Sequence, residues 1–203
     1  MLETISTFRP LPPLSAQDEA YIRNEYYTLH ELCLTRVESA DECRSKIRAR
    51  QLPLPAYLIG SLEYYPSDFF LFPDSVDPAT GMQKAFFERY RRVAGAYGEK
   101  PSETQLLEEF EGYLSGEYAV CLKIVTPETI FLKGLAMTQI DKLFADANQS
   151  GPARAFQLKA WVNRLEGWER QFAPCDTARF GSLPSRVRYI DRARSSFPEI
   201  FGL

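Results

Sequence analysis

The chain has 203 residues, of which 45% are apolar and 25% are charged, so its length allows one large domain or two small ones and its composition excludes a disordered protein. It contains no apolar run near the roughly 18 residues that a membrane span needs, and residues 1–14 lack the basic and apolar regions of a secretion signal. We therefore expect a cytoplasmic protein without a membrane partner. The net charge of −3 is uneven, because residues 1–80 are acidic overall and residues 179–203 carry five arginines against two acidic side chains.

The four cysteines and the single histidine do not form a pattern typical of a metal or nucleophilic site. Cys33, Cys43, Cys121 and Cys175 lack the short paired spacing of zinc ligands, so we expect buried thiols, no metal and no cofactor. His30 lies in an amphipathic helical stretch, where a solvent-facing imidazole is more common than a catalytic base.

The N-terminal part is predicted to contain an extended arm followed by short helices. Pro10, Pro12 and Pro13 prevent a regular helix in residues 1–14. Three hydroxyl residues are each followed three positions later by an acid, which is typical of a capped helix start. These pairs are Ser15 with Asp18, Thr28 with Glu31, and Ser39 with Glu42.

A β-hairpin is predicted after residue 50. The Leu-Pro-Leu-Pro sequence at 52–55 excludes a helix. It is followed by two aromatic and branched segments, 57–59 and 62–65, which are separated by Gly60 and Ser61. Glycine at the first central position of a two-residue loop favours a type II′ turn.

The rest of the chain is predicted to be helical. Proline, serine and threonine signals place helix starts at Asp77, Ser102, Thr126, Gly151 and Pro184. The helix from Thr126 is expected to run to about Ala147, and the next is expected to continue to Phe172 before Pro174. Segment 117–125 fits a helix or a strand equally well. The predicted inward faces contain Met82, Phe86, Phe87, Tyr90 and Val93; Leu106, Phe110, Tyr113 and Leu114; Phe156, Trp161, Leu165 and Trp168; and Val187 and Ile190.

These elements predict a mainly α fold in which a small unit with a hairpin packs on a larger helical domain. The expected boundaries are 1–14 for the arm, 15–76 for a winged helix-turn-helix-like unit with a small β-hairpin, and 77–203 for the C-terminal helical domain.

The N-terminal unit resembles the MerR-like winged helix-turn-helix. Residues 27–33 are similar to the first helix of that family, residues 39–50 to its basic second helix, and Gln51-Leu52-Pro53 to its Gly-Leu-Leu-Pro exit with the glycine replaced. The resemblance implies DNA recognition by a transcriptional regulator. Residues 28–65, however, carry five basic and five acidic side chains, so a structural or protein-binding role is favoured over DNA.

Over most of its length the chain resembles an uncharacterised bacterial domain-of-unknown-function family, number 6058, whose members are described as natural-product biosynthesis proteins. The similar segments are 52–57, 118–128 and 179–190. The resemblance implies an accessory protein or small enzyme of specialised metabolism that acts on an anionic or carrier-bound small molecule. It assigns no catalytic residues and leaves open whether the protein is an enzyme. A DNA-binding regulator and a non-catalytic protein-interaction module are the alternatives, and the sequence does not indicate an oligomeric state.

The C-terminal arginines are the leading candidates for a ligand site. Arg179, Arg186 and Arg188, with Ser185 at a predicted helix start and Tyr189 beside them, could bind one anion through planar guanidinium groups and free backbone N–H groups. Ion pairing of the same arginines with acids of the N-terminal half is the equally weighted alternative.

A second set of residues could line a pocket. Cys121 lies among apolar neighbours, so we expect a buried packing residue rather than a nucleophile. Glu128 and Lys133 could form an acid/base pair, although the helix dipole already explains Glu128 and the five-residue spacing does not place the two on one face. The pocket candidates are Tyr118, Cys121, Glu128, Lys133, Trp161 and Trp168.

Overall fold

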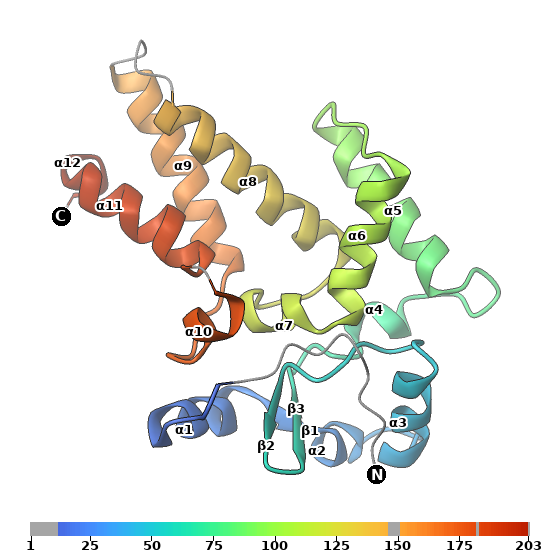
Figure 1. Ribbon diagram of the computed structural model, residues 1–203. Coiled ribbons are helices and arrows are strands. Elements are labelled where there is room, and N and C mark those ends of the chain that lie inside the picture. The colour runs from blue at the N-terminus through green and yellow to red at the C-terminus, as the bar shows by residue number, and fades with distance from the viewer. Residues whose placement is uncertain (1–11, 146–150, 182, 203) are drawn as a thin grey trace.

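The computed structural model describes residues 12–145, 151–181 and 183–202. It is mainly helical with one small antiparallel sheet, which confirms the predicted fold class (Figure 1). The N-terminal elements and the sheet lie at one end of the molecule, and two pairs of long helices extend from them. None of the described helices combines the length and the apolar character that crossing a bilayer requires.

Three short helices form the N-terminal part, as predicted. They are α1 (Ala16–Glu25), α2 (Leu29–Cys33) and α3 (Ala40–Arg48). Each begins at the predicted capping box, in which the side chain of Ser15, Thr28 or Ser39 accepts a hydrogen bond from a backbone N–H of the first turn. His30 is exposed on α2, as expected. The four cysteines are buried and free.

The predicted hairpin is present and gains a third strand. Strands β2 (Tyr57–Ile59) and β3 (Leu62–Tyr65) pair on either side of Gly60 and Ser61. Strand β1 (Tyr27–Thr28) pairs with the other edge of β3, so the sheet order is β1-β3-β2. The third strand was not predicted, because two residues between helices are too few to show the alternation typical of a strand.

The chain between the sheet and the long helices differs from the prediction. A short helix, α4 (Leu71–Asp74), follows β3. The predicted helix start at Asp77 is wrong, because the Asp77 carbonyl accepts a hydrogen bond from Thr80 N–H and forms a turn. Helix α5 (Met82–Ala96) begins only after Gly81, whose φ is 77°.

The next three long helices of the second half begin where the sequence predicts. Helix α6 (Glu103–Leu114) begins at the Ser102 cap and buries the face that was predicted. Helix α8 (Pro127–Ala145) begins at Thr126-Pro127, and its expected end near Ala147 lies outside the described residues. Helix α9 (Pro152–Trp168) begins at Pro152 as expected.

The end of α9 was predicted incorrectly, and its inward face was predicted in part. The helix stops at Trp168, because Glu169 is extended and pairs with Leu122. Its buried face contains Leu158, Val162 and Leu165. Of the predicted face, Leu165 is buried and both tryptophans pack against the cores, whereas Phe156 is 75% exposed. The contacts with α8 and the C-terminal helices select this face, and an apolar stripe in the sequence does not show which neighbours are present.

Segment 117–125 uses both conformations that the sequence left open. Residues 117–121 form the short helix α7 (Glu117–Cys121), and Leu122 is then extended against Glu169. This pairing joins the end of α7 to the end of α9 and places the Cys121 backbone next to the buried Glu169.

A helix begins next to Pro184, as predicted, and runs without a break from the π-helix η1 (Arg186–Asp191) into α11 (Arg192–Ser196). The short helix α10 (Asp176–Phe180) precedes it, and α12 (Pro198–Phe201) follows it. Tyr189 and Ile190 are buried in η1, whereas Val187 is 38% exposed, so its predicted inward position is wrong. The wider π-helical turn changes which positions share a face.

The largest buried cluster is shared between the N-terminal elements and the helical domain. It contains Ile22, Tyr26 and Tyr57 together with Phe86 and Tyr90 of α5. A second cluster lies among α2, α3 and β3, and a third joins α8, α9 and the C-terminal helices. The boundary expected at residue 76 therefore does not separate two cores.

Candidate functional site

Arg179, the first predicted anion ligand, lies inside the protein. Its guanidinium donates a hydrogen bond to the Ala56 carbonyl at 2.6 Å and lies over the Tyr57 ring. The residue is only 6% exposed, and burial lowers the pKa of its guanidinium. Arg179 therefore links α10 to the start of β2.

Arg186 and Ser185 contact carboxylates of the helical domain rather than a free surface. Arg186 donates to Glu166 at 2.8 Å, and Arg194 donates to the same carboxylate at 2.6 Å. Burial opposes ionisation of Glu166, but the hydrogen bonds from Arg194 and Arg186 outweigh it and lower the pKa. The Ser185 hydroxyl donates to Glu169.

Arg188, in contrast, lines an open hollow of about 460 Å³ at η1 and α11. The Arg188 guanidinium lies 5.2 Å from the centre of the Tyr189 ring, and that of Arg192 lies 4.4 Å from the centre of the Phe144 ring. Among the described residues, neither guanidinium donates a hydrogen bond or forms an ion pair. The hollow is lined by Leu183, Val187, Arg188, Asp191, Arg192 and Ser195.

Four of the five predicted ligand residues thus bind different partners within the protein, and Arg188 remains at the surface. Tyr189 is 4% exposed and donates to Asp141 at 3.0 Å. Of the five, only Arg188 lines the hollow. Arg192 is not among the predicted ligand residues, although its position one helical turn after Arg188 was an available signal.

A buried polar cluster connects α8, the end of α9 and the start of η1. Lys133 Nζ lies 3.4 Å from Glu169 Oε1, and the side chains are 12% and 0% exposed. Ser185 donates to the same carboxylate oxygen. Burial raises the pKa of Glu169 although Lys133 and Ser185 favour its charged form. Glu169 was not predicted, because its burial depends on the pairing with Leu122.

Cys121 borders this cluster as a protonated thiol. It is 7% exposed, and its Sγ lies 3.5 Å from the Tyr118 carbonyl oxygen. Burial raises the pKa of the thiol, although the Lys133 ammonium acts in the opposite direction. A thiol with a raised pKa is a poor nucleophile at neutral pH.

The remaining pocket candidates have separate partners. Tyr118 donates to Glu109, which also accepts a hydrogen bond from Tyr90 at 3.3 Å, and burial raises the pKa of this carboxyl. Glu128 accepts two hydrogen bonds from Arg89, both of 2.7 Å, and so does not pair with Lys133.

The two tryptophans are partly buried beside α8. Trp161 packs under the Arg164 guanidinium, whose carbon is 4.9 Å from the ring centre. Trp161 and Trp168 both contact the apolar clusters of the helical domain. Neither lines the hollow at η1 and α11.

Metal binding has no geometric basis within the described part of the chain. No group of three or more histidine, cysteine, aspartate or glutamate side chains is placed there to hold an ion.

The second half of the chain also carries the similarity to known sequences. The model of the family of unknown function DUF6058 matches residues 82–198, which is more than half of the chain. The chain belongs to this family. Neither a curated protein nor a solved structure was found to match it.

The DUF6058 segment contains both polar features of the helical domain. Lys133, Glu169 and Ser185 of the buried cluster lie within it, as do Arg188 and Arg192 of the hollow. Helices α1 to α4 and the sheet precede the matched segment.

Proposed function

We propose that this DUF6058 protein binds an anionic small molecule, free or carrier-bound, at the hollow of η1 and α11. The supporting observation is the pair of guanidinium groups of Arg188 and Arg192, which no described carboxylate neutralises within ion-pair distance. Asp191 also lines the hollow but pairs with neither arginine. Arginine side chains held on rings present hydrogen-bond donors suited to a phosphate or carboxylate.

The apolar side chains of the hollow indicate the rest of the ligand. Leu183 is 55% exposed and Val187 is 38% exposed, and both lie beside the arginines. A ligand with an anionic group attached to an aliphatic chain matches both surfaces, because water is displaced from the apolar residues while the charge meets Arg188 and Arg192. A phosphate-bearing carrier arm has this chemistry.

The proposed setting is an accessory protein or small enzyme of bacterial specialised metabolism. This setting rests on the resemblance of the sequence to proteins described in that way. The geometry of the hollow favours ligand binding over catalysis. Among the residues that line it, Asp191 is the one side chain suited to act as a general acid or base.

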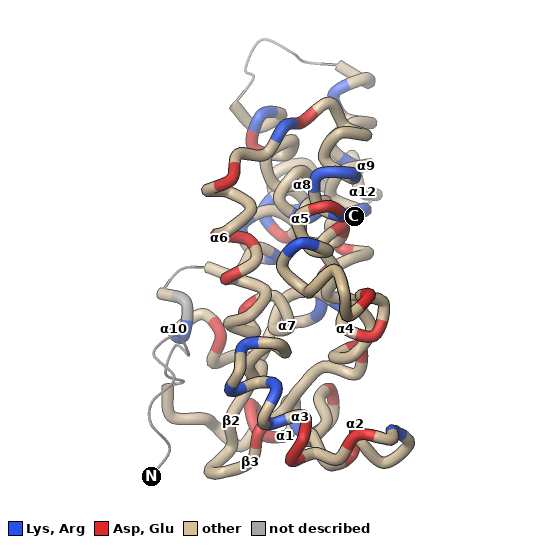
Figure 2. The backbone as a smooth tube through the Cα atoms, turned by 90° about the vertical axis from the view of Figure 1, so that its right-hand side faces the viewer, with Lys and Arg blue, Asp and Glu red and all other residues tan. Residues whose placement is uncertain are grey.

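DNA binding has less support. On α3, Arg44 pairs with Asp41 at 2.8 Å and Lys46 pairs with Glu38. In the view of Figure 2, basic and acidic positions are interspersed at every level of the molecule. A duplex would have to displace these carboxylates before the phosphates could be bound, and the release of counterions would be small.

Thermal unfolding with and without anions tests the proposed site. Phosphate, citrate and phosphopantetheine are titrated against the wild type and against Arg188→Gln/Arg192→Gln. A ligand at 100 times its dissociation constant should stabilise the wild type by about 2.7 kcal/mol. The double variant should lose this stabilisation. Its unliganded stability should fall by at most about 1–2 kcal/mol, because two arginine–ring contacts are lost but no ion pair is broken.

Arg92→Gln is the matched control, since Arg92 is an exposed arginine of α5. This variant should respond to anions as the wild type does. The proposal is wrong if no anion stabilises the wild type, or if the double variant retains the full response.

A further inference from the structure

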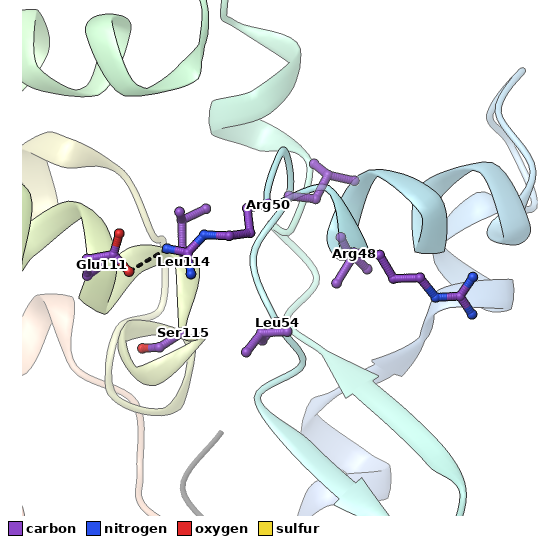
Figure 3. Close-up of a pocket in the computed structure, with 8 residues that line it drawn as sticks. Arg48, Arg50, Leu54, Glu111, Leu114 and Ser115 are labelled. Carbon is purple, nitrogen blue, oxygen red and sulfur yellow. Dashed lines mark hydrogen bonds and ion pairs between the residues drawn. The ribbon is translucent and has the colours of Figure 1, made fainter. Parts of the chain in front are cut away.

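A second cavity lies at the junction between the N-terminal unit and α6. It has a volume of about 110 Å³, and Figure 3 shows it between α3, the Leu-Pro segment and the end of α6. Its walls are apolar and at most 8% exposed, and its rim is polar. The walls are Ile47, Leu52, Leu54 and Leu114, and the rim residues are Arg48, Arg50, Glu111 and Ser115.

Arg50 has an unusual backbone at this rim. Its φ of 57° makes it the one non-glycine residue with a positive φ in the described chain. This left-handed residue ends α3 in a Schellman motif, because the Arg50 N–H donates to the Ile47 carbonyl and the Gln51 N–H donates to the Lys46 carbonyl. Glycine is usual at this position, and here an arginine side chain extends from the end of α3 toward α6 (Figure 3).

The Arg50 guanidinium retains donors for a ligand. Nη2 donates to the Glu111 carboxylate, and the Arg50 and Glu111 side chains are 52% and 53% exposed. A guanidinium has five N–H groups, and this contact uses one nitrogen. Arg48 points away from Glu111 in Figure 3, so Arg50 supplies the cationic group of the rim.

We propose that this cavity binds a short-chain aliphatic carboxylate, with the hydrocarbon chain among the apolar walls and the carboxylate on Arg50. An apolar cavity of 150 Å³ accommodates benzene, so this volume suits a chain of about four carbons. An ammonium group at the same position would face the Arg50 cation, and the Glu111 carboxylate that could attract it is already paired with Arg50. The site is separate from the hollow at η1 and α11.

Calorimetric titration with butyrate, butylamine and 1-butanol tests the ligand class. Butyrate should bind the wild type at least about tenfold more tightly than butylamine or butanol, because one charged hydrogen bond contributes at least this factor. Decanoate should not bind more tightly than butyrate, because the cavity has no room for the longer chain. Equal binding of the three C4 compounds, or affinity that rises steadily up to decanoate, would overturn the proposal.

Three substitutions test the role of the rim. Arg50→Gly should weaken butyrate binding at least about tenfold, to the affinity of butanol. It should also raise the melting temperature by about 2–4 °C, because glycine adopts the left-handed backbone without cost. Glu111→Gln should tighten butyrate binding by about two- to fivefold, since it removes the competing carboxylate. Glu108→Gln, another acid of α6, should leave binding unchanged.

Retention of the full wild-type affinity for butyrate by Arg50→Gly would overturn the proposal. The double variant Arg188→Gln/Arg192→Gln distinguishes this cavity from the hollow at η1 and α11. Butyrate binding should be unchanged in that variant. Loss of butyrate binding would place the bound butyrate in the hollow and overturn this inference.

Discussion

Asp176 shows how burial controls a single ionisable side chain. The residue is 0% exposed, and its carboxyl group accepts hydrogen bonds of 2.8 Å from the Tyr57 hydroxyl and from the Ala173 N–H. Burial raises the pKa of this carboxyl to about 6, although both hydrogen bonds favour the charged form. The folded protein therefore holds this proton at a pH where the unfolded chain has released it.

Stability is expected to fall as the pH rises from about 4 to about 6, because the folded state binds more protons than the unfolded state over this range. The shift corresponds to a loss of roughly 3 kcal/mol, which is complete above the folded pKa. Asp176→Asn should remove this part of the pH dependence, so the variant gains stability relative to the wild type between pH 4 and 6. Urea unfolding across this range measures the difference. The exposed control Glu99→Gln should follow the wild type, and a pH-independent difference for Asp176→Asn would contradict the assignment.

At the scale of elements, Gly116 joins the end of α6 to the Leu-Pro segment. Its φ is 76°, and a Cβ atom added to it would lie 2.6 Å from the Leu54 carbonyl oxygen. The backbone of Leu54 also donates a hydrogen bond of 2.8 Å to the Leu114 carbonyl. Close approach of two backbones therefore requires glycine here.

Gly116→Ala should lower the free energy of unfolding by about 3 kcal/mol, because a left-handed alanine costs about 1–2 kcal/mol and the contact with Leu54 adds to it. Gly60→Ala is the matched control: its φ is 60°, but an added Cβ would meet nothing within 4 Å. The free energy of unfolding of the control should fall by only about 1–2 kcal/mol, which is the cost of a left-handed backbone conformation for alanine. Denaturant midpoints compare the two variants, and equal losses would show that the contact with Leu54 does not matter.

At the scale of the whole molecule, polar contacts reinforce the shared core. The Cys175 N–H donates to Asp18 at 2.8 Å, and Tyr57 donates to Asp176. The rings of Tyr26 and Tyr57 also pack edge to face, with centroids 4.9 Å apart, within the cluster that reaches α5. Unfolding of one unit would expose apolar surface of the other.

The protein is therefore expected to unfold in one cooperative transition. In scanning calorimetry, the measured enthalpy should equal the van't Hoff enthalpy, and tyrosine fluorescence should follow the same curve as the helical signal in circular dichroism. Two separate transitions would contradict the shared core and would support independent units on either side of residue 76.

Local signals determined much of the secondary structure. The capping boxes at Ser15, Thr28 and Ser39, the proline at the start of α8 and the Gly60-Ser61 turn act within about four residues, so the sequence alone was sufficient to predict them. The mainly α fold and membership of the DUF6058 family also followed from the sequence.

Long-range contacts decided the rest. Pairing with β3 creates β1, pairing with Leu122 ends α9 and buries Glu169, and the π-helix removes Val187 from the core. The predicted arginine cluster separates for the same reason: Arg179 meets Ala56 and Arg186 meets Glu166, while Arg188 stays at the surface. Desolvation and pairing depend on neighbours that are distant in the chain, and periodicity contains no information about those neighbours.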